Sequence, residues 1–266
     1  MRLSFYQVDA FTDRPFGGNF AGVVPLTEWL PDATMQAIAT ENNLSETAFF
    51  VPDSEGRGDG YALRWFTPAI EVDLCGHATL GSAYVITRFL APERRSLSFR
   101  TVKAGTLEVT REGEELAMDF PAWPSQPADP PAGLAAALGG TPERYLRGKR
   151  DGLAVFRSEA EIAALKPDFA ALKRLFPFAV IATAPGDNGT DFVSRFFAPG
   201  AGLDEDPVTG SAHCALIPYW AERLGKTRLK ARQISKRVGH ISGKMRGERV
   251  TIAGRVALYL EGTIEV

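Results

Sequence analysis

Hydrophobic and polar residues alternate along much of the chain, and this pattern predicts a protein built from both strands and helices. In the first half, alternation and β-branched or aromatic content indicate strands near residues 2–10, 46–51, 61–66, 97–102, 106–111 and 115–120. The second half contains comparable segments near 151–157, 178–184, 191–197, 228–235, 240–245, 248–253 and 255–261. Helical spacing favours helices near 32–41, 77–90, 131–138, 167–175 and 209–224. The last helix contains Pro218, which should kink it or shift its hydrogen bonds.

A cluster of prolines between Pro121 and Pro131 separates the two halves. Because proline has a fixed φ and no N–H, we expect this segment to lack regular structure and to act as a linker. A length of 266 residues also favours two domains over one. The sequence therefore predicts an N-terminal α+β domain over 1–121 and a C-terminal α+β domain over 122–266, whose last strand could cross to the first domain.

The two halves contain similar segments. Residues 61–68 (YALRWFTP) align with residues 192–199 (FVSRFFAP), and each segment is followed by a glycine that opens a stretch of small residues. The glycine is Gly76 in the first copy and Gly210 in the second, which has three additional residues before it. A supersecondary unit used twice favours pseudo-twofold packing, with chance likeness as the alternative.

Two helix starts, at Gly76-His77 and at Gly210-Ser211, are expected from this repeat. The first N–H groups of a helix have no partner within the helix and carry the positive end of its dipole. If the two starts face one another across a domain interface, they form a site for a carboxylate or for an oxyanion. Two ordinary helix starts are the simpler interpretation.

Glu46 is the candidate acid-base. It lies where a loop enters a strand and is followed by Ala48, Phe49 and Phe50. Half-burial against these apolar residues would raise the glutamate pKa toward neutrality, as general acid-base catalysis requires. A capping or surface glutamate is the alternative. Asp206 precedes the second helix start, where it could stabilise the helix dipole or orient His77 across the interface.

Four ordered motifs resemble those of the phenazine-biosynthesis isomerase (PhzF-like) family. They are Asp9-Ala10-Phe11-Thr12 with Gly17-Gly18-Asn19, Ser45-Glu46-Thr47-Ala48-Phe49, Cys75-Gly76-His77-Ala78-Thr79, and Asp206-Pro207-Val208-Thr209-Gly210-Ser211-Ala212-His213. The likeness covers essentially the whole chain. It implies an α+β fold of the diaminopimelate-epimerase type, with two pseudo-symmetric domains that each wrap a curled, mostly antiparallel sheet around a central helix.

The resemblance also implies an isomerase that moves a proton between carbons of a small, carboxylate-bearing molecule. Its site would lie in the interdomain cleft and would need neither metal nor cofactor. By motif position, Glu46, His77 and Asp206 would be catalytic. The substrate-binding residues would be Gly76, Gly210, Ser211 and Asn19. A homodimer is a further implication.

One stretch departs from the commonest family pattern. Where many relatives have Gln-Gly, this chain has Gln233-Ile234-Ser235, followed by Arg237-Val238-Gly239-His240. We expect this departure to leave the proposed proton-transfer residues untouched and to affect the rim of the site.

Three other functions compete with the isomerase. A two-thiol epimerase would use Cys75, but the position matching its second thiol is Thr209, and Cys214 lies one helical turn further on. A zinc site made of Cys75, His77, His213 and Cys214 would have uncommon ligand spacings. A non-catalytic binding protein of the same fold is the third alternative.

The composition and charge of the chain argue against some classes of binding partner. A formal net charge of -2 provides no field for nucleic acid or an anionic membrane. The basic stretch that contains Lys230 and Arg232 alternates at strand spacing, which favours a solvated sheet face. The start of the sequence lacks a signal-peptide pattern, and two cysteines are too few for a disulfide framework. We therefore expect a cytoplasmic protein that binds a small anion.

Overall fold

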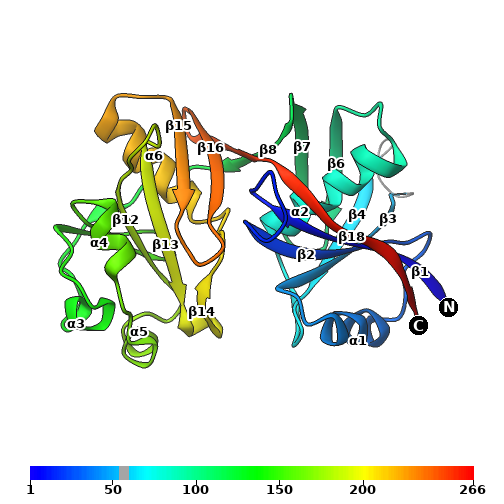
Figure 1. Cartoon of the computed structure of the whole chain (residues 1–266), viewed down its shortest axis with the longest axis horizontal. Coiled ribbons are helices and arrows are strands. Elements are labelled where there is room, and N and C mark those ends of the chain that lie inside the picture. The colour runs from blue at the N-terminus through cyan, green and yellow to red at the C-terminus, as the bar shows by residue number, and fades with distance from the viewer. Residues whose placement is uncertain (54–59) are drawn as a thin grey trace. The chain divides into compact units, whose positions relative to one another are not determined.

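Two units make up the chain in a computed structural model that describes residues 1–53 and 60–266. Unit 1 consists of residues 1–119 and 253–266, and unit 2 consists of residues 120–252. Figure 1 shows the elements of each unit, with both ends of the chain in unit 1. The C-terminal strand reaches unit 1 because it pairs along the whole N-terminal strand, from Arg2 opposite Glu265 to Ala10 opposite Val256.

Strands predominate among the regular elements of unit 1. The strands are β1 (Arg2–Ala10), β2 (Asn19–Pro25), β3 (Glu46–Pro52), β4 (Tyr61–Phe66), β5 (Glu71–Val72), β6 (Ser96–Thr101), β7 (Thr106–Glu112), β8 (Glu115–Pro121) and β18 (Val256–Glu265). The helices are α1 (Asp32–Asn42), α2 (Gly76–Val85) and the π-helix η1 (Ile86–Leu90). The expected helix over 77–90 is therefore an α-helix that ends in a π-helical turn.

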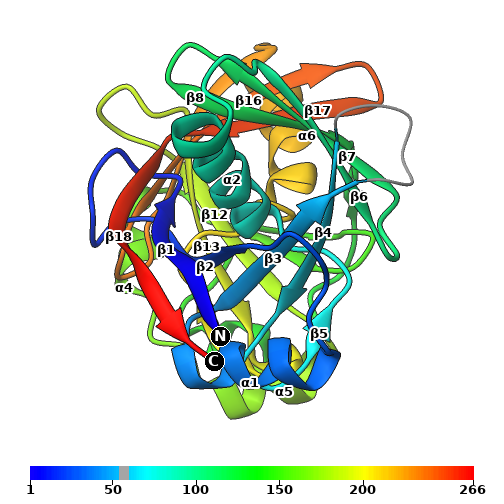
Figure 2. The ribbon, with the colours of Figure 1, turned by 90° about the vertical axis from the view of Figure 1, so that its right-hand side faces the viewer.

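The sheet of unit 1 is mostly antiparallel and curls around α2. Its hydrogen-bonded order is β18, β1, β2, β3, β4, β6, β7, β8, in which β2–β3 and β4–β6 are parallel. Figure 2 shows α2 within this curl, in contact with β1, β2 and β3. Small residues permit the enclosure, since a Cβ on Gly81 would lie 2.8 Å from Cγ2 of Val8.

Unit 2 alternates strands with short helices. Its strands are β9 (Gln126–Pro127), β10 (Arg144–Arg147), β11 (Gly152–Val155), β12 (Val180–Pro185), β13 (Phe192–Ala198), β14 (Leu203–Asp206), β15 (Arg228–Gln233), β16 (Gly239–Arg246) and β17 (Arg249–Gly254). Its helices are α3 (Leu134–Leu138), α4 (Glu159–Ala164), α5 (Phe169–Leu175), the 3₁₀ turn η2 (Pro199–Ala201) and α6 (His213–Leu224).

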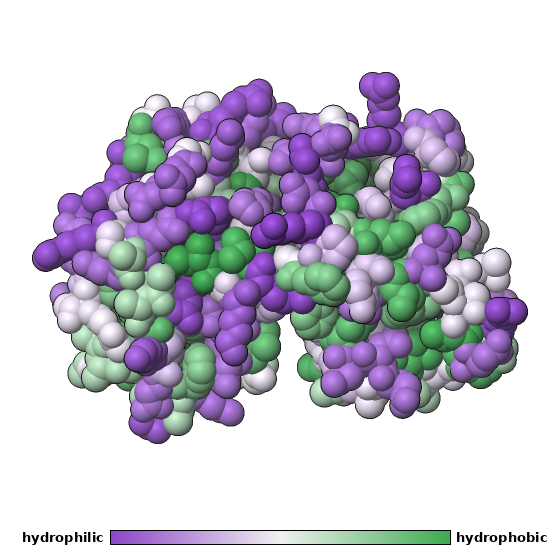
Figure 3. All heavy atoms as spheres, in the orientation of Figure 1, coloured by the Kyte–Doolittle hydropathy of each residue, from purple (hydrophilic) through white to green (hydrophobic). Residues whose placement is uncertain are grey.

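The hydrogen-bonded order in unit 2 is β9, β10, β11, β12, β13, β15, β16, with β11–β12 and β13–β15 parallel. Phe156, Leu172 and Phe197 belong to the apolar core that packs α3, α4 and α5 on this sheet. On β15, Lys230 is exposed as expected of a solvated sheet face, whereas Arg232 is half-buried and donates to the carboxylate of Glu159. Figure 3 shows that hydrophilic residues cover much of the drawn surface of unit 2.

The sequence repeat corresponds to a repeated set of strand pairings. β4 is antiparallel to β3 and parallel to β6, and a short antiparallel strand, β5, is bonded to its end. β13 has the same relation to β12, β15 and β14. The match of pairing pattern and sequence makes chance likeness an inadequate explanation of the repeat.

An arginine in each copy holds the short strand in place. Nε and Nη2 of Arg64 donate to the two carboxylate oxygens of Glu71 at 2.7 Å, and Arg195 donates in the same way to Glu205 at 2.8 Å. Each guanidinium also lies over an aromatic ring two residues further along its strand, that of Phe66 or Phe197. Arginine therefore has the same structural task in both units.

The start of α6 differs from the prediction of a helix over 209–224. Gly210, Ser211 and Ala212 form a turn, and the helix begins at His213. Within this turn the bonds are tighter than in an α-helix, because His213 N–H donates to Gly210 O and Cys214 N–H donates to Ser211 O. The expected helix start at Gly210-Ser211 is therefore a turn that leads into the helix.

Pro218 lies inside α6 without ending it. A residue at this position would normally donate its N–H to the carbonyl of Cys214, and proline has no N–H to give. The N–H of Trp123 donates to that carbonyl instead, at 2.8 Å. The segment after β8 therefore supplies the hydrogen bond that the helix lacks.

Some elements went unrecognised in the sequence. The proline cluster was expected to exclude regular structure, yet Gln126–Pro127 pairs with β10. β2 was missed because Gly22 and Pro25 interrupt its pattern. The short helix α4 was also missed, although Ser158 Oγ accepts a hydrogen bond from Glu161 N–H, an N-cap that the spacing Ser-x-x-Glu indicates.

Among residues 1–53 and 60–266, no helix is long and apolar enough to span a membrane.

Candidate active site

Glu46, Cys75 and His77 meet in unit 1 at the start of α2. Glu46 is the first residue of β3, opposite Ala21 of the parallel strand β2. Cys75 is the N-cap of α2 and His77 is the second helical residue. Because α2 packs against both β2 and β3, the loop-to-strand junction at Glu46 faces the beginning of the helix. Two motifs that are separated by 29 residues of sequence therefore form one cluster.

The cluster is largely closed to solvent. The side chains of His77 and Glu46 are 9% and 19% exposed, and Cys75 is buried. Nε2 of His77 lies 3.0 Å from Oε2 of Glu46. The two groups form an ion pair, and Oε2 is buried. A buried carboxylate oxygen of this kind has unused capacity for a proton or another cation.

The pKa of Glu46 is shifted in the direction opposite to our expectation. Burial by itself raises the pKa, but the charge of His77 and hydrogen bonds from His77 and Cys75 outweigh burial and hold the pKa of Glu46 below its usual value. Burial also opposes the charge on His77, yet Cys75 and Glu46 raise the pKa of His77 well above its usual value. At neutral pH the pair is carboxylate and imidazolium.

Asn19 contacts the second ring nitrogen of His77, and Ser45 bonds to Asn19. Nδ2 of Asn19 lies 3.3 Å from Nδ1 of His77, and Ser45 Oγ donates to Oδ1 of Asn19 at 3.3 Å. A serine hydroxyl can donate or accept, so rotation of the Asn19 amide satisfies Nδ1 whether or not it carries a proton. Asn19, which was predicted to bind substrate, thus also positions His77.

The first turn of α2 has no side-chain cap. The N-cap Cys75 makes no side-chain cap hydrogen bond, so the leading N–H groups of Gly76 and His77 have no partner from the cap side chain. A Cβ placed on Gly76 would meet only Met118 Cε, at 3.5 Å, which is an ordinary contact. Packing in unit 1 therefore does not require glycine at this position.

Asp206 belongs to unit 2 and anchors the loop before α6. Thr209 Oγ1 donates to Asp206 Oδ2 at 2.5 Å, and Gln233 Nε2 donates to the Asp206 carbonyl at 2.7 Å. Gln233 Oε1 accepts from Thr209 N–H, and Ser235 Oγ donates to the Pro207 carbonyl. The departure from the family pattern begins after Gln233, at Ile234, whose N–H donates to the Ser194 carbonyl. That this departure leaves the proposed proton-transfer residues untouched stays a prediction.

Ser211 has a cationic neighbour that the sequence did not reveal. Arg150 Nη2 donates to Ser211 Oγ at 3.0 Å, and Arg150 Nε and Nη2 donate to the carboxylate of the adjacent Asp151. The guanidinium lies 4.1 Å from the centroid of the Phe178 ring. A basic residue in a loop gives no signal of its own. Its partner is 61 residues away, so only the fold shows this pair.

The other predicted positions are divided between the two units. Gly76, His77, Glu46 and Asn19 lie in unit 1, whereas Gly210, Ser211 and Asp206 lie in unit 2. The expected contact of Asp206 with His77 stays a prediction. Of the four residues considered as zinc ligands, Cys75 and His77 belong to unit 1 and His213 and Cys214 to unit 2.

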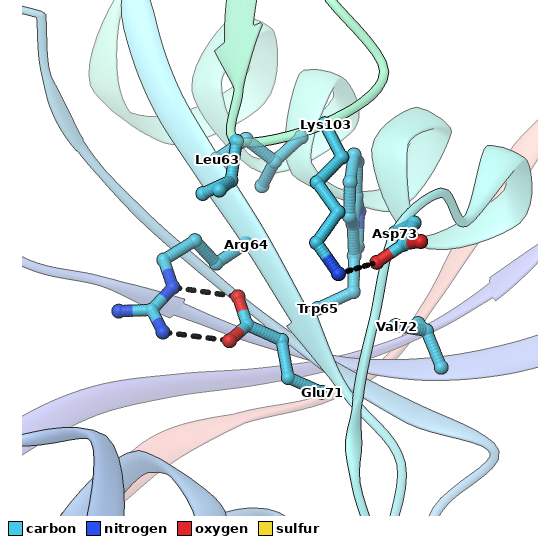
Figure 4. A pocket seen from close by; sticks show the side chains of 8 residues that line it. Leu63, Arg64, Trp65, Glu71, Val72, Asp73 and Lys103 are labelled. Atoms are coloured by element: carbon cyan, nitrogen blue, oxygen red, sulfur yellow. Dashed lines mark hydrogen bonds and ion pairs between the residues drawn. The ribbon is translucent and has the colours of Figure 1, made fainter.

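A pocket of about 70 Å³ beside β4 and β5 is separate from this group (Figure 4). Its lining contains the Arg64–Glu71 and Lys103–Asp73 ion pairs, so these charges are already paired. None of the site residues expected from the sequence lines it. The pocket is therefore part of the structural corner that β4 and β5 form.

Comparison with known proteins identifies the family. The family model described as phenazine biosynthesis-like protein (PhzC-PhzF) matches residues 8–262. The chain belongs to the PhzC-PhzF family. An uncharacterized isomerase of Pseudomonas aeruginosa is 53% identical, with all of both chains aligned. The human phenazine biosynthesis-like domain-containing protein is 37% identical, with 99% of both chains covered.

Solved structures of the family share the fold. A PhzF-family phenazine biosynthesis protein from Enterococcus faecalis aligns with a TM-score of 0.95 and 44% identity, covering all of both chains. The expected diaminopimelate-epimerase-like fold is confirmed by this match and by the curled sheet around α2. Several relatives of this chain are named uncharacterized isomerases.

Proposed function

We propose that this PhzF-family protein is an isomerase that moves a proton between carbons of a small, carboxylate-bearing substrate, with Glu46 as the single acid-base. The observation that carries the proposal is the buried contact between Glu46 and His77 at the uncapped start of α2. A carboxylate whose pKa lies below its usual value is ionised at neutral pH, so it is in the form that can act as a base, although it is a weaker base than a carboxylate with a raised pKa. Once protonated, it returns that proton readily.

The developing negative charge is stabilised by groups beside Glu46. When a proton leaves a carbon next to a carbonyl, charge moves to the oxygen. The imidazolium of His77 and the N–H groups of Gly76 and His77 lie at the start of α2 and can bind that oxygen. Partial burial strengthens these interactions, since less water competes for them.

In the same proposal, Arg150 and Ser211 of unit 2 bind the substrate carboxylate. The guanidinium is fixed by Asp151 and by the Phe178 ring, so it loses little freedom when an anion binds. The placement of substrate in an interdomain cleft rests on the repeated sequence pattern, in which Gly76 corresponds to Gly210.

The thiol alternative is less well supported. Burial, followed by the charge of Glu46, raises the pKa of Cys75 to about 11, and burial raises the pKa of Cys214 to about 12. Both groups are therefore protonated at neutral pH, whereas an epimerase base must be a thiolate. A carboxylate base does not have this difficulty.

Exchange of substrate hydrogen with solvent tests the proposal. A panel of small carboxylates is incubated with the protein in D₂O, and deuterium at carbon is followed by NMR. We expect Glu46→Gln to abolish exchange, while the matched change Glu41→Gln at an exposed glutamate of α1 leaves it unchanged. Cys75→Ala and Cys214→Ala should retain most of the activity.

Two results would favour a different function. Loss of exchange in the cysteine variants alone would favour the two-thiol epimerase. Absence of both binding and exchange across the panel would favour a non-catalytic binding protein. The homodimer stays a prediction, which sedimentation equilibrium of the purified chain would test.

A further inference from the structure

Cys75, His77 and Glu46 bring three metal-binding donor types together. The thiol sulfur, a ring nitrogen and a carboxylate oxygen all lie within 4.8 Å of one another. Sγ of Cys75 is 3.9 Å from Nε2 of His77, and Nε2 is 3.0 Å from Oε2 of Glu46. Among residues 1–53 and 60–266, no other trio of these residue types is grouped so closely.

The separations fit a tetrahedral ion once the Cys75 side chain turns toward Nε2, because Sγ now lies beside the ring, 3.5 Å from Nδ1 and 3.9 Å from Nε2. Zinc bonds are about 2.3 Å to sulfur and about 2.0–2.1 Å to nitrogen or oxygen, so tetrahedral angles place S and N about 3.5 Å apart and N and O about 3.3 Å apart. The observed distances differ from these values by a few tenths of an ångström, in opposite directions. An ion between the donors would draw Sγ closer and move Oε2 slightly away.

Two features of the surroundings favour a bound cation. Oε2 of Glu46 is buried and lies 3.0 Å from Nε2 of His77, so an ion between these two atoms replaces one cationic partner of the carboxylate with another. Nδ1 of His77 contacts the Asn19 side chain, which orients the ring while Nε2 faces the carboxylate. A hydrogen bond on the second ring nitrogen is the usual support of a metal-binding histidine.

We propose that Cys75, His77 and Glu46 bind a thiophilic divalent cation of the Zn²⁺ type, and that this ion inhibits the protein by occupying the acid-base. Thiolate and imidazole select such ions over Mg²⁺ or Ca²⁺, which prefer oxygen ligands. As the metal–sulfur and metal–nitrogen bonds form, the Cys75 thiol and Nε2 of the His77 imidazolium each release one proton to solvent, and no group is oxidised or reduced. Three protein ligands leave the fourth position for water.

Ligand binding and inhibition are separate consequences. The binding of the ion follows from the three donors alone. The inhibitory effect rests on the proposed function, since an ion on Glu46 prevents that carboxylate from accepting a proton. The ion is thus a competitor of the proton.

Cobalt titration tests the binding. Co²⁺ is added to the metal-stripped full chain, because a cobalt–thiolate bond gives a charge-transfer absorption band and four-coordinate Co²⁺ gives intense visible bands. We expect saturation at one equivalent, with Zn²⁺ displacing the cobalt. Cys75→Ser should remove the thiolate band and weaken binding by about 10-fold or more, in the range found when metal-site groups are lost.

The matched control is Cys214→Ser, which changes the other buried cysteine, in unit 2, and should leave the band intact. Glu46→Gln should keep the band and weaken binding. Circular dichroism and thermal unfolding establish that each variant is folded. No saturable binding of Co²⁺ or Zn²⁺, or a thiolate band that persists in Cys75→Ser, would overturn the site.

The inhibition is measured separately with the D₂O exchange assay. Zn²⁺ should abolish exchange by the wild-type chain, and a chelator should restore it. Full exchange at saturating Zn²⁺ would refute inhibition. A chain that binds Co²⁺ through Cys75 but never exchanges hydrogen would refute the proposed isomerase and leave the metal site standing.

Discussion

Nε2 of His77 lies 3.0 Å from Oε2 of Glu46, and this contact reverses the effect of burial on the carboxylate. The apolar residues that follow Glu46 would by themselves favour the neutral acid. The cationic His77 ring favours the carboxylate more strongly than burial disfavours it, so Glu46 is ionised before substrate binds. Its function then depends on a helix that starts 30 residues later in the chain.

Two glycines of α2 should respond differently to the same substitution. A Cβ at position 76 has an ordinary contact with Met118, whereas a Cβ at position 81 would lie 2.8 Å from Val8. We expect Gly81→Ala to lower the free energy of unfolding by about 1–3 kcal/mol through overpacking. Gly76→Ala should leave it nearly unchanged in urea denaturation.

The same pair separates stability from catalysis. If the backbone at Gly76 approaches the substrate, a methyl group there should lower turnover in the exchange assay by about 10-fold or more, because small misplacements of reacting groups are costly. Full activity in a stable Gly76→Ala variant would show that substrate does not approach this turn.

Arg150 should govern substrate affinity. Loss of a charged hydrogen bond to a carboxylate costs about 1.5–3 kcal/mol, so Arg150→Ala should raise KM by about 10–100-fold with a smaller change in kcat. Arg150→Lys keeps the charge and should recover part of the loss. The control is Arg147→Ala, at an exposed arginine of β10. Equal effects of the two alanine variants would argue against a binding role for Arg150.

His213 should make the protein less stable in mild acid. Nδ1–H of His213 donates to the Thr209 carbonyl at 2.9 Å, and Nε2 is buried without a hydrogen bond from the described residues. Burial lowers the pKa of His213 from 6.5 to about 4. Between these two values the unfolded chain binds more protons than the folded chain, so this contribution to stability is lost as pH falls from about 6.5 toward 4.

The predicted loss from His213 is about 2 kcal/mol at pH 5 relative to pH 7.5. His213→Asn retains a donor for the Thr209 carbonyl and removes the titrating ring. Urea unfolding of both proteins at the two pH values measures the difference. A wild type and variant with the same pH dependence would contradict the assignment to His213.

Arg195 should contribute more to stability than an exposed arginine. Its side chain is 13% exposed and donates to Glu205 and to the carbonyls of Ile162 and Leu165. A lysine cannot reproduce this fork, so Arg195→Lys should lower the free energy of unfolding by about 1–3 kcal/mol. Arg147→Lys is the matched control. A loss no larger than that of the control would show that the ion pair has little structural value.

The sequence by itself determined the strand-and-helix pattern, the repeat and the candidate residues. Alternation together with aromatic and β-branched content identified β1, β3 and β4 closely, although β3 is buried over consecutive residues rather than at every second one. The repeat was readable because the same arginine and aromatic residues hold the short strands β5 and β14 in place. The motifs around Glu46, Gly76 and Ser211 drew attention to the residues of the proposed site.

Only the tertiary structure decided how these residues act. The pKa of Glu46, the contact of Arg150 with Ser211 and the bond from Trp123 to Cys214 each depend on segments far apart in sequence. Local pattern reports propensity and burial, whereas charge and hydrogen bonding depend on which distant atoms are brought within a few ångströms. Packing of α2 against β2 and β3 therefore gives Glu46 its cationic partner, which its own neighbours in sequence do not provide.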